Sequence, residues 1–240
     1  MSFGSVAESY ERFRLGYADE LVDAVLGHAE RPVRTGLEVG AGTEKATRLF
    51  ARRGVELTAL EPDGDMVTVL ERVTQGLPVH PVVTPFERFD SECRFDLVYA
   101  AAAWHWTDPT TRWTRATDLL MPGGVLALFG GHVELRDSDL FATVGEIEQP
   151  VLDGVLSNDA HPWSFEEVAE VDGLVGVEEH ELPNVRTTTA DEYVGLLSTV
   201  SAYLALAPEL RAETLRQIRA ALPDHVDIDA RVTLHLARRS

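Results

Sequence analysis

The sequence has little cysteine and no long apolar run. Cys93 is the only cysteine among the 240 residues, so an intramolecular disulfide is excluded and a cytoplasmic location is expected. The longest apolar run, Leu97 to Trp104, is far shorter than the roughly 20 apolar residues that cross a bilayer. Residues 1–13 contain Glu8 and Glu11 and have no apolar centre, so we expect no signal peptide.

Basic residues are also scarce. The chain has 21 Lys and Arg against 40 Asp and Glu, a formal net charge of −19, and Lys45 is its only lysine. Such a charge repels phosphate backbones and anionic lipids, so we expect neither nucleic acid nor a membrane as partner. No cluster of cysteine, histidine and carboxylate residues has the spacing of metal ligands, so no metal site is expected. The sequence carries no signal for the oligomeric state.

Short apolar runs alternate with helical patterns in the first half of the chain. The alternation predicts βαβ units and a doubly wound, mostly parallel α/β sheet. In such a sheet, ligands bind beyond the carboxyl ends of the strands, where the strand order reverses. The expected strands are 36–39, 55–60, 79–83, 95–101 and 125–129, and the expected helices are 19–28, 43–53, 66–73 and 108–120.

The pattern changes after residue 130. Residues 131–172 show weaker periodicity, and 175–182 could form a strand. Tyr193 to Leu204 carry one continuous helical stripe, and a helix over 210–222 follows the first-turn proline Pro208. Residues 232–236 alternate between apolar and polar side chains, which predicts a half-buried terminal strand.

A glycine-rich loop lies where the first strand turns into the first helix. Gly40 and Gly42 allow a ligand to approach the backbone, and the amides at the helix start favour a negative group. Glu61 ends the second strand, where a carboxylate can accept both hydroxyls of a ribose. A dinucleotide-binding loop needs a third glycine, and Lys45 stands there. A nicotinamide oxidoreductase is therefore a less favoured alternative.

Four motifs together resemble the class I S-adenosylmethionine-dependent methyltransferases, in particular their small-molecule branch of the type 11 or 25 kind. They are Glu38-Val39-Gly40-Ala41-Gly42-Thr43, Glu61-Pro62-Asp63 with Met66, Phe95 to Ala100 running into Ala103 to Pro109, and Leu119 to Gly124. The resemblance implies a Rossmann-like sheet of seven strands with an antiparallel last strand and a helical lid. It also implies methyl transfer from S-adenosylmethionine to O, N or C of a small acceptor, a metabolite or natural product.

The resemblance further implies which residues bind the cofactor. The glycine loop would pass under its methionyl part, Glu61 would bind the ribose, and Met66 would pack on adenine. Two alanine carbonyls after the fourth strand would hold the amine, and an N-terminal Tyr and Arg would close over the carboxylate. The expected set is Tyr10, Arg14, Glu38, Gly40, Ala41, Gly42, Thr43, Glu61, Pro62, Met66, Phe86, Glu87, Ala100 and Ala101.

One residue departs from the family pattern. Glu44 stands where a glycine is usual. We expect a benign acid in the first turn of a helix, where a negative charge suits the helix dipole. If Glu44 instead repelled the cofactor, the chain would be a non-catalytic module that binds a cofactor or a protein, which is the second alternative.

Four residues are candidates for contact with the acceptor. His105 follows the fourth strand, and an imidazole with a pKa near 6.5 can act as a general base, so His105 is the catalytic candidate. It could equally form part of the pocket wall. Trp106 is expected to face the pocket, because an aromatic face attracts a cation. His132, after the fifth strand, and Tyr203, in the lid, are the expected substrate contacts.

We expect one methyltransferase domain over residues 1–240. Its expected parts are an N-terminal cap helix region over 1–30, a cofactor-binding core over 31–130, a lid and substrate region over 131–222, and a terminal strand over 230–237 that returns to the sheet.

Overall fold

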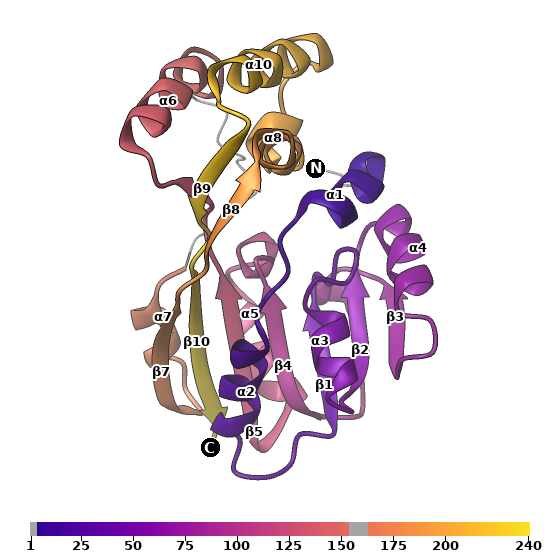
Figure 1. Ribbon diagram of the computed structural model, residues 1–240. Coiled ribbons are helices and arrows are strands. Elements are labelled where there is room, and N and C mark those ends of the chain that lie inside the picture. Colours follow the sequence, from indigo (N-terminus) through magenta and orange to yellow (C-terminus); the bar gives the residue numbers. More distant parts are fainter. Residues whose placement is uncertain (1–3, 154–162) are drawn as a thin grey trace.

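The computed structural model describes residues 4–153 and 163–240, and in them a seven-stranded sheet forms the base of the molecule (Figure 1). The strand order is β3-β2-β1-β4-β5-β10-β7. The strands are β1 (Thr35–Val39), β2 (Glu56–Glu61), β3 (Val79–Val83), β4 (Phe95–Ala101), β5 (Leu120–Gly130), β7 (Leu174–Leu182) and β10 (Val232–Arg239). β1 to β5 run parallel, whereas β10 is antiparallel to β5 and β7. The predicted doubly wound α/β sheet is confirmed.

Helices cover both faces of this sheet. Successive side chains of a strand point to opposite faces, so Leu97 and Tyr99 of β4 pack under α2 and α3, whereas Val98 and Ala100 pack under α5 and α7. Burial on both faces explains why the parallel strands read as continuous apolar runs. The covering helices are α2 (Asp19–His28), α3 (Thr47–Arg52) and α4 (Gly64–Val73) on one face, and α5 (Arg112–Leu119) and α7 (Phe165–Ala169) on the other.

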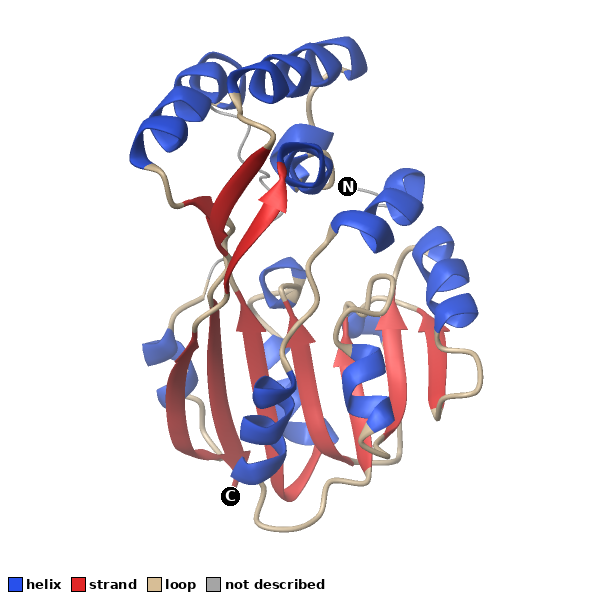
Figure 2. Ribbon diagram, viewed as in Figure 1, coloured by secondary structure: helices blue, strands red, loops and turns tan. Residues whose placement is uncertain are grey.

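A second layer, which we name the helical cap, stands beyond the carboxyl ends of the parallel strands (Figures 1 and 2). β8 and β9 carry the chain into and out of it, as continuations of β7 and β10. Its own apolar cluster includes Leu135, Tyr193 and Ile218. The cap consists of α6 (Ser138–Leu152), α8 (Ala190–Leu197), α9 (Ser201–Leu204), α10 (Pro208–Ala221), β6 (Glu134–Leu135), β8 (Val185–Thr189) and β9 (His225–Asp229).

The N-terminal helix α1 (Ala7–Phe13), which follows a short 3-10 helix over Gly4–Val6, bridges the two layers. It packs on α4 at one end and on α8 of the cap at the other. Gly195 of α8 makes the second contact possible, because a Cβ there would lie only 2.4 Å from the ring of Phe13. Further 3-10 helices span Phe86–Arg88 and Trp104–Trp106.

Two helices start later than the sequence predicts. The helix expected over 43–53 begins at Thr47, because residues 43–46 form a turn in which Glu44 has a φ of 143°. The helix expected over 108–120 begins at Arg112, because the carboxylate of Asp108 accepts hydrogen bonds from the hydroxyls of Thr110 and Thr111 and holds a turn there. Short polar side chains compete with helical hydrogen bonding in this way.

In the second half of the chain, the observed elements differ more from the predicted ones. The single helical stripe expected from Tyr193 to Leu204 is wrong: the chain forms α8 and α9, with a break at 198–200. The hydroxyls of Ser198 and Thr199 bond the carbonyls of Gly195 and Leu196 and end α8. α6 and the small sheet were not predicted, because α6 contains Gly145 and Pro150 and buries only Val144 fully. Residues 154–162 of the expected lid lie outside the described residues.

None of the helices within residues 4–153 and 163–240 is both long enough and apolar enough to cross a membrane.

Gly131, directly after β5, tests the junction between sheet and cap. A Cβ there would lie 2.0 Å from the backbone oxygen of Arg231. We expect Gly131→Ala to lower the free energy of unfolding by about 1–3 kcal/mol, as overpacking does. Gly145→Ala in α6 is the control: nothing lies within 4 Å of its Cβ, and the better helix former should add up to about 1 kcal/mol. Urea denaturation measures both, and equal stabilities would contradict the assigned junction.

Candidate active site

The glycine loop has a backbone that only glycine adopts without strain. Gly40 has a φ of 69° and Gly42 a φ of 59°, both in the left-handed region. A Cβ at Gly40 would also lie 2.5 Å from the Cβ of Ala103. The loop therefore lies directly against the segment that follows β4.

Glu61 holds this loop in place. Its Oε2 accepts a hydrogen bond from the Gly42 amide at 2.9 Å, and its Oε1 accepts one from the Asp63 amide at 3.0 Å. The Ala41 amide donates to the Leu60 carbonyl at 2.9 Å, which adds a third bond between loop and strand end. Burial raises the pKa of Glu61, against the opposing effect of the Asp63 and Gly42 amides. Each carboxylate oxygen keeps a lone pair for a further donor.

Glu38 supports the loop from below. It is completely buried, and the hydroxyl of Thr47 donates to its Oε2 at 2.6 Å. Burial raises the pKa of Glu38 to about 8, against the opposing effect of Thr47. Glu38 lines neither of the two cavities described next. Its observed contact is thus with the first turn of α3.

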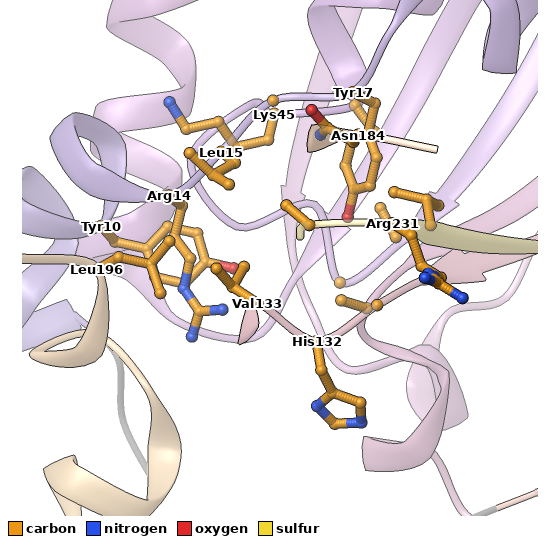
Figure 3. A pocket seen from close by; sticks show the side chains of 18 of the residues that line it. Tyr10, Arg14, Leu15, Tyr17, Lys45, His132, Val133, Asn184, Leu196 and Arg231 are labelled. Atoms are coloured by element: carbon orange, nitrogen blue, oxygen red, sulfur yellow. The ribbon is translucent and has the colours of Figure 1, made fainter. Parts of the chain in front are cut away.

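The first cavity, about 80 Å³, lies above the glycine loop (Figure 3). Among the described residues, the charged side chains that line it are all positive: Arg14, Lys45 and Arg231. Arg14 reaches from α1 into the cap, where its Nε and Nη2 donate to the hydroxyl and carbonyl oxygens of Thr199, each at 2.9 Å. The guanidinium also lies over the ring of Tyr10, 5.1 Å from its centre. This cavity suits a carboxylate-bearing group.

The second cavity, about 280 Å³, opens beside the first and shares Ala102, Gly131 and His132 with it. Figure 3 shows the His132 ring pointing away from Tyr10, on the far side of the first cavity. His105 lines the second cavity from the end of β4. Burial lowers the pKa of His105, and the charges of His132 and Arg112 lower it further. His105 is therefore neutral at pH 7 and able to accept a proton.

The two cavities bring together eight of the eighteen site residues named from the sequence. Of these, Tyr10, Arg14, Gly40, Ala41 and Ala101 line the first cavity, Ala100 and His105 line the second, and His132 lines both. Gly42 and Glu61 are joined by the hydrogen bond at the loop.

A second group surrounds the cavities without lining them. Met66 is buried against Ala7 and Val69, and the ring of Phe86 packs on Trp104 at 5.6 Å. The Glu87 carboxylate accepts the amide of Asp108 at 2.7 Å. Thr43 is completely buried beside the loop and Pro62 is exposed.

Two expected substrate contacts are placed elsewhere. Tyr203 is buried inside the cap, where its hydroxyl donates to Glu148, and it lines neither cavity. The interior position follows from the break after α8, which turns α9 and its tyrosine into the apolar cluster of the cap. Trp106 is half-buried beside the His105 ring, and its neighbour Trp104 lines the second cavity instead.

Sequence reasoning also missed cavity residues. Trp163, Thr233 and His235 line the second cavity. Thr233 and His235 alternate with the apolar residues of β10, so the period of the terminal strand could have placed them on one face. Trp163 carries no local signal. Among the described residues, no group of three or more His, Cys, Asp or Glu is arranged to hold a metal ion.

This geometry defines a class of enzyme. A parallel sheet with a reversed terminal strand, a glycine loop after β1 and an acid at the end of β2 is the arrangement of class I methyltransferases, which use S-adenosylmethionine. Residues 37–128 match the family model of a methyltransferase domain. Uncharacterized methyltransferases of Mycobacterium bovis and Mycobacterium tuberculosis are each 30% identical over 225 residues, 94% of this chain and 87% of theirs. The chain belongs to the methyltransferase family.

Solved structures agree with the fold. A putative type II methyltransferase from Anaeromyxobacter dehalogenans superposes with a TM-score of 0.71 at 21% identity, over 94% of this chain and 98% of that one. The phosphoethanolamine N-methyltransferase 2 of Haemonchus contortus, solved with S-adenosylhomocysteine, gives 0.56 at 16% identity over 98% of this chain and 57% of that one. The protein is a methyltransferase with S-adenosylmethionine as its cofactor, and the oxidoreductase and non-catalytic alternatives are set aside.

Glu44 has a strained backbone. Its φ of 143° is one that L-residues rarely adopt, which agrees with the glycine usual in the family. Its carboxylate bonds Arg48 at 2.7 Å and lies 3.6 Å from Lys45, and it lines neither cavity. The side chain is thus turned toward α3, and its benign role stays a prediction.

We expect Glu44→Gly to be more stable than Glu44→Ala by about 1 kcal/mol. Both substitutions delete the carboxylate, and only glycine relieves the positive φ. Thermal or urea unfolding of the two variants measures the difference. Equal stabilities would show that the turn at Glu44 is not strained.

The raised pKa of Glu38 predicts that the stability of the protein depends on pH. Because its pKa is higher in the folded protein, about 8 against 4.5, the folded state holds this proton more tightly than the unfolded chain does. The contribution of Glu38 is therefore complete below pH 4.5 and is lost as the pH rises toward 8. Relative to Glu38→Gln, the wild type should lose stability over this range, as urea denaturation at several pH values would show. A constant difference, as expected for the exposed control Glu20→Gln, would contradict the assignment.

Proposed function

We propose that the acceptor is a small molecule, a metabolite or natural product that receives the methyl group on O, N or C. The observation that carries this proposal is the meeting of the two cavities at His132, one against the glycine loop and the other against aromatic walls. A cofactor in the first cavity and an acceptor in the second would share that boundary. The net charge of −19 argues against a nucleic-acid acceptor.

The residues around the first cavity fit the cofactor. Gly40 and Gly42 place no Cβ of their own on the loop, and Arg14 can bind a carboxylate. We infer that Glu61 binds the ribose hydroxyls with its remaining lone pairs, and that Arg14 with Tyr10 holds the methionyl carboxylate. The carbonyls of Ala100 and Ala101 would hold the amine. S-adenosylmethionine supplies an electrophilic methyl group on its sulfonium sulfur.

Binding of the whole cofactor needs a movement of α1. The first cavity, about 80 Å³, is well below the roughly 300 Å³ of a typical ligand pocket. Ala7 of α1 covers Met66, the residue proposed to pack on adenine. We infer that α1 separates from α4 when the nucleoside enters and that the Arg14–Thr199 bonds keep it attached to the cap.

His105 is the proposed general base. It lines the acceptor side, and it is neutral at pH 7 because burial lowers its pKa. It would remove a proton from the acceptor while the two cavities hold nucleophile and methyl group in line. In this proposal the core over 31–130 binds the cofactor, and the lid over 131–222 helps to select the acceptor.

Glu61→Gln tests the ribose assignment. The amide keeps one acceptor oxygen and loses the charge that strengthens its hydrogen bonds, so we expect S-adenosylhomocysteine to bind at least about tenfold more weakly, in line with the roughly 1.5–3 kcal/mol of a charged hydrogen bond. Isothermal titration calorimetry measures this. Glu56→Gln is the matched control, an exposed residue at the other end of β2, and should bind as the wild type does.

Two outcomes would contradict these assignments. Unchanged affinity of Glu61→Gln would remove Glu61 from the ribose site. A wild-type protein that failed to bind S-adenosylhomocysteine would overturn the proposed function as a whole.

A further inference from the structure

We propose that the second cavity takes a flat, uncharged acceptor with a weakly acidic hydroxyl, a phenol or an enol, and that the enzyme is an O-methyltransferase. This inference rests on the proposed function, and it names the acceptor class of the same site. The cavity, about 280 Å³, lies at the small end of ligand pockets, so it suits a compound of one or two rings.

The walls of the cavity favour a planar ligand. The rings of Trp163 and His235 meet at 4.7 Å with an angle of 74°, so they form a corner. A flat ring that stacks on one of them meets the edge of the other, and aromatic pairs prefer both geometries. The corner is held from outside, because His235 bonds Glu179 at 2.7 Å and Trp163 packs edge-on against Trp113. The walls are thus fixed before a ligand enters.

The described lining of the cavity offers no ion partner to a charged acceptor. Among the described residues that line it there is no Asp, Glu, Lys or Arg, and the titratable groups are His105, His132 and His235. An ammonium or carboxylate placed there would lose its hydration without gaining an ion partner, which costs several kcal/mol. A neutral compound avoids that cost. Thr233 offers a hydroxyl to a polar substituent.

Two imidazoles stand where the proton must leave. His132 lies on the boundary with the first cavity, and His105 faces it within the second. The charged group that faces His105 from α5 is Arg112, which disfavours a second positive charge. The hydroxyl proton passes to the imidazole of His105, the freed oxygen pair forms the new C–O bond, and the methyl–sulfur bond breaks with its electron pair left on sulfur. A weakly acidic hydroxyl suits this exchange, because a neutral imidazole is a moderate base.

The test measures binding, not turnover. The protein saturated with S-adenosylhomocysteine is titrated with 4-nitrophenol, with 4-nitroanisole, which lacks the hydroxyl proton, and with tyramine, which is a cation. Quenching of tryptophan fluorescence reports occupancy, and the visible spectrum reports how much of the bound phenol is ionised. We expect 4-nitrophenol to bind at least tenfold more tightly than the other two, and to bind in its neutral form, because burial without an ion partner raises the pKa of a phenol.

Three variants assign the site. Thr233→Phe fills the cavity and should abolish 4-nitrophenol binding while S-adenosylhomocysteine still binds within twofold of the wild-type affinity. His105→Gln should bind 4-nitrophenol more weakly, because the amide is a weaker hydrogen-bond acceptor than the imidazole, and should leave the binding of 4-nitroanisole unchanged. His180→Gln, at a half-buried histidine on the neighbouring strand β7 that does not line the cavity, is the matched control and should change neither reading.

The outcomes distinguish a failure of the phenol assignment from a failure of the proposed methyltransferase function. Tighter binding of tyramine, or 4-nitrophenol binding that survives Thr233→Phe, would overturn the phenol assignment. A protein that binds S-adenosylhomocysteine but not 4-nitrophenol would overturn it too, while the methyltransferase site stood. Loss of S-adenosylhomocysteine binding by the wild type would instead overturn the proposed function itself.

Discussion

The active site depends on one carboxylate that holds one loop. Glu61 ends β2 and accepts the amides of Gly42 and Asp63, so the turn after β1 is fixed to the neighbouring strand and to the start of α4. That attachment needs the positive φ of Gly42, which brings its amide round to the carboxylate. A carboxylate that holds the loop and keeps free lone pairs can also accept hydrogen bonds from a ligand. In the proposed site, the two oxygens that hold the loop would also bind the ribose.

The helical cap contributes part of the wall of the first cavity, through Leu196 of α8. The parallel strands alone would leave their carboxyl ends open to water, and a group transfer needs water excluded. Arg14 joins α1 to Thr199 in the cap, and Gly195 lets Phe13 approach α8 closely. The N-terminal helix is therefore attached to the cap by hydrogen bonds and by packing. A movement of α1 on cofactor binding, as proposed above, would therefore act on the cap as well.

The sequence predicts the sheet and the cofactor half of the site because both are local. The central parallel strands are buried on two faces, so their sequences are apolar runs. The predicted bounds of the five parallel strands agree with the structure to within one residue, apart from the earlier start of β5, whereas the terminal strand expected over 232–236 continues to Arg239. The glycine loop and Glu61 lie on adjacent strands separated by one helix, a spacing that a motif can carry. The backbone at Glu44 could not be predicted in this way, because nothing in the residue type indicates its positive φ.

The acceptor half could not be predicted in the same way. Its walls come from three distant segments, His105 after β4, Trp163 before α7 and His235 in β10, and only the packing of β10 between β5 and β7 brings them together. Tyr203 looked like a free lid residue, yet the break between α8 and α9 turns it into the cap interior. A surface that no single element builds leaves no periodic pattern in the sequence. If the second cavity binds the acceptor, as proposed above, acceptor choice follows from tertiary contacts, and changes at Thr233 or Trp163 would alter it without touching any motif of the family.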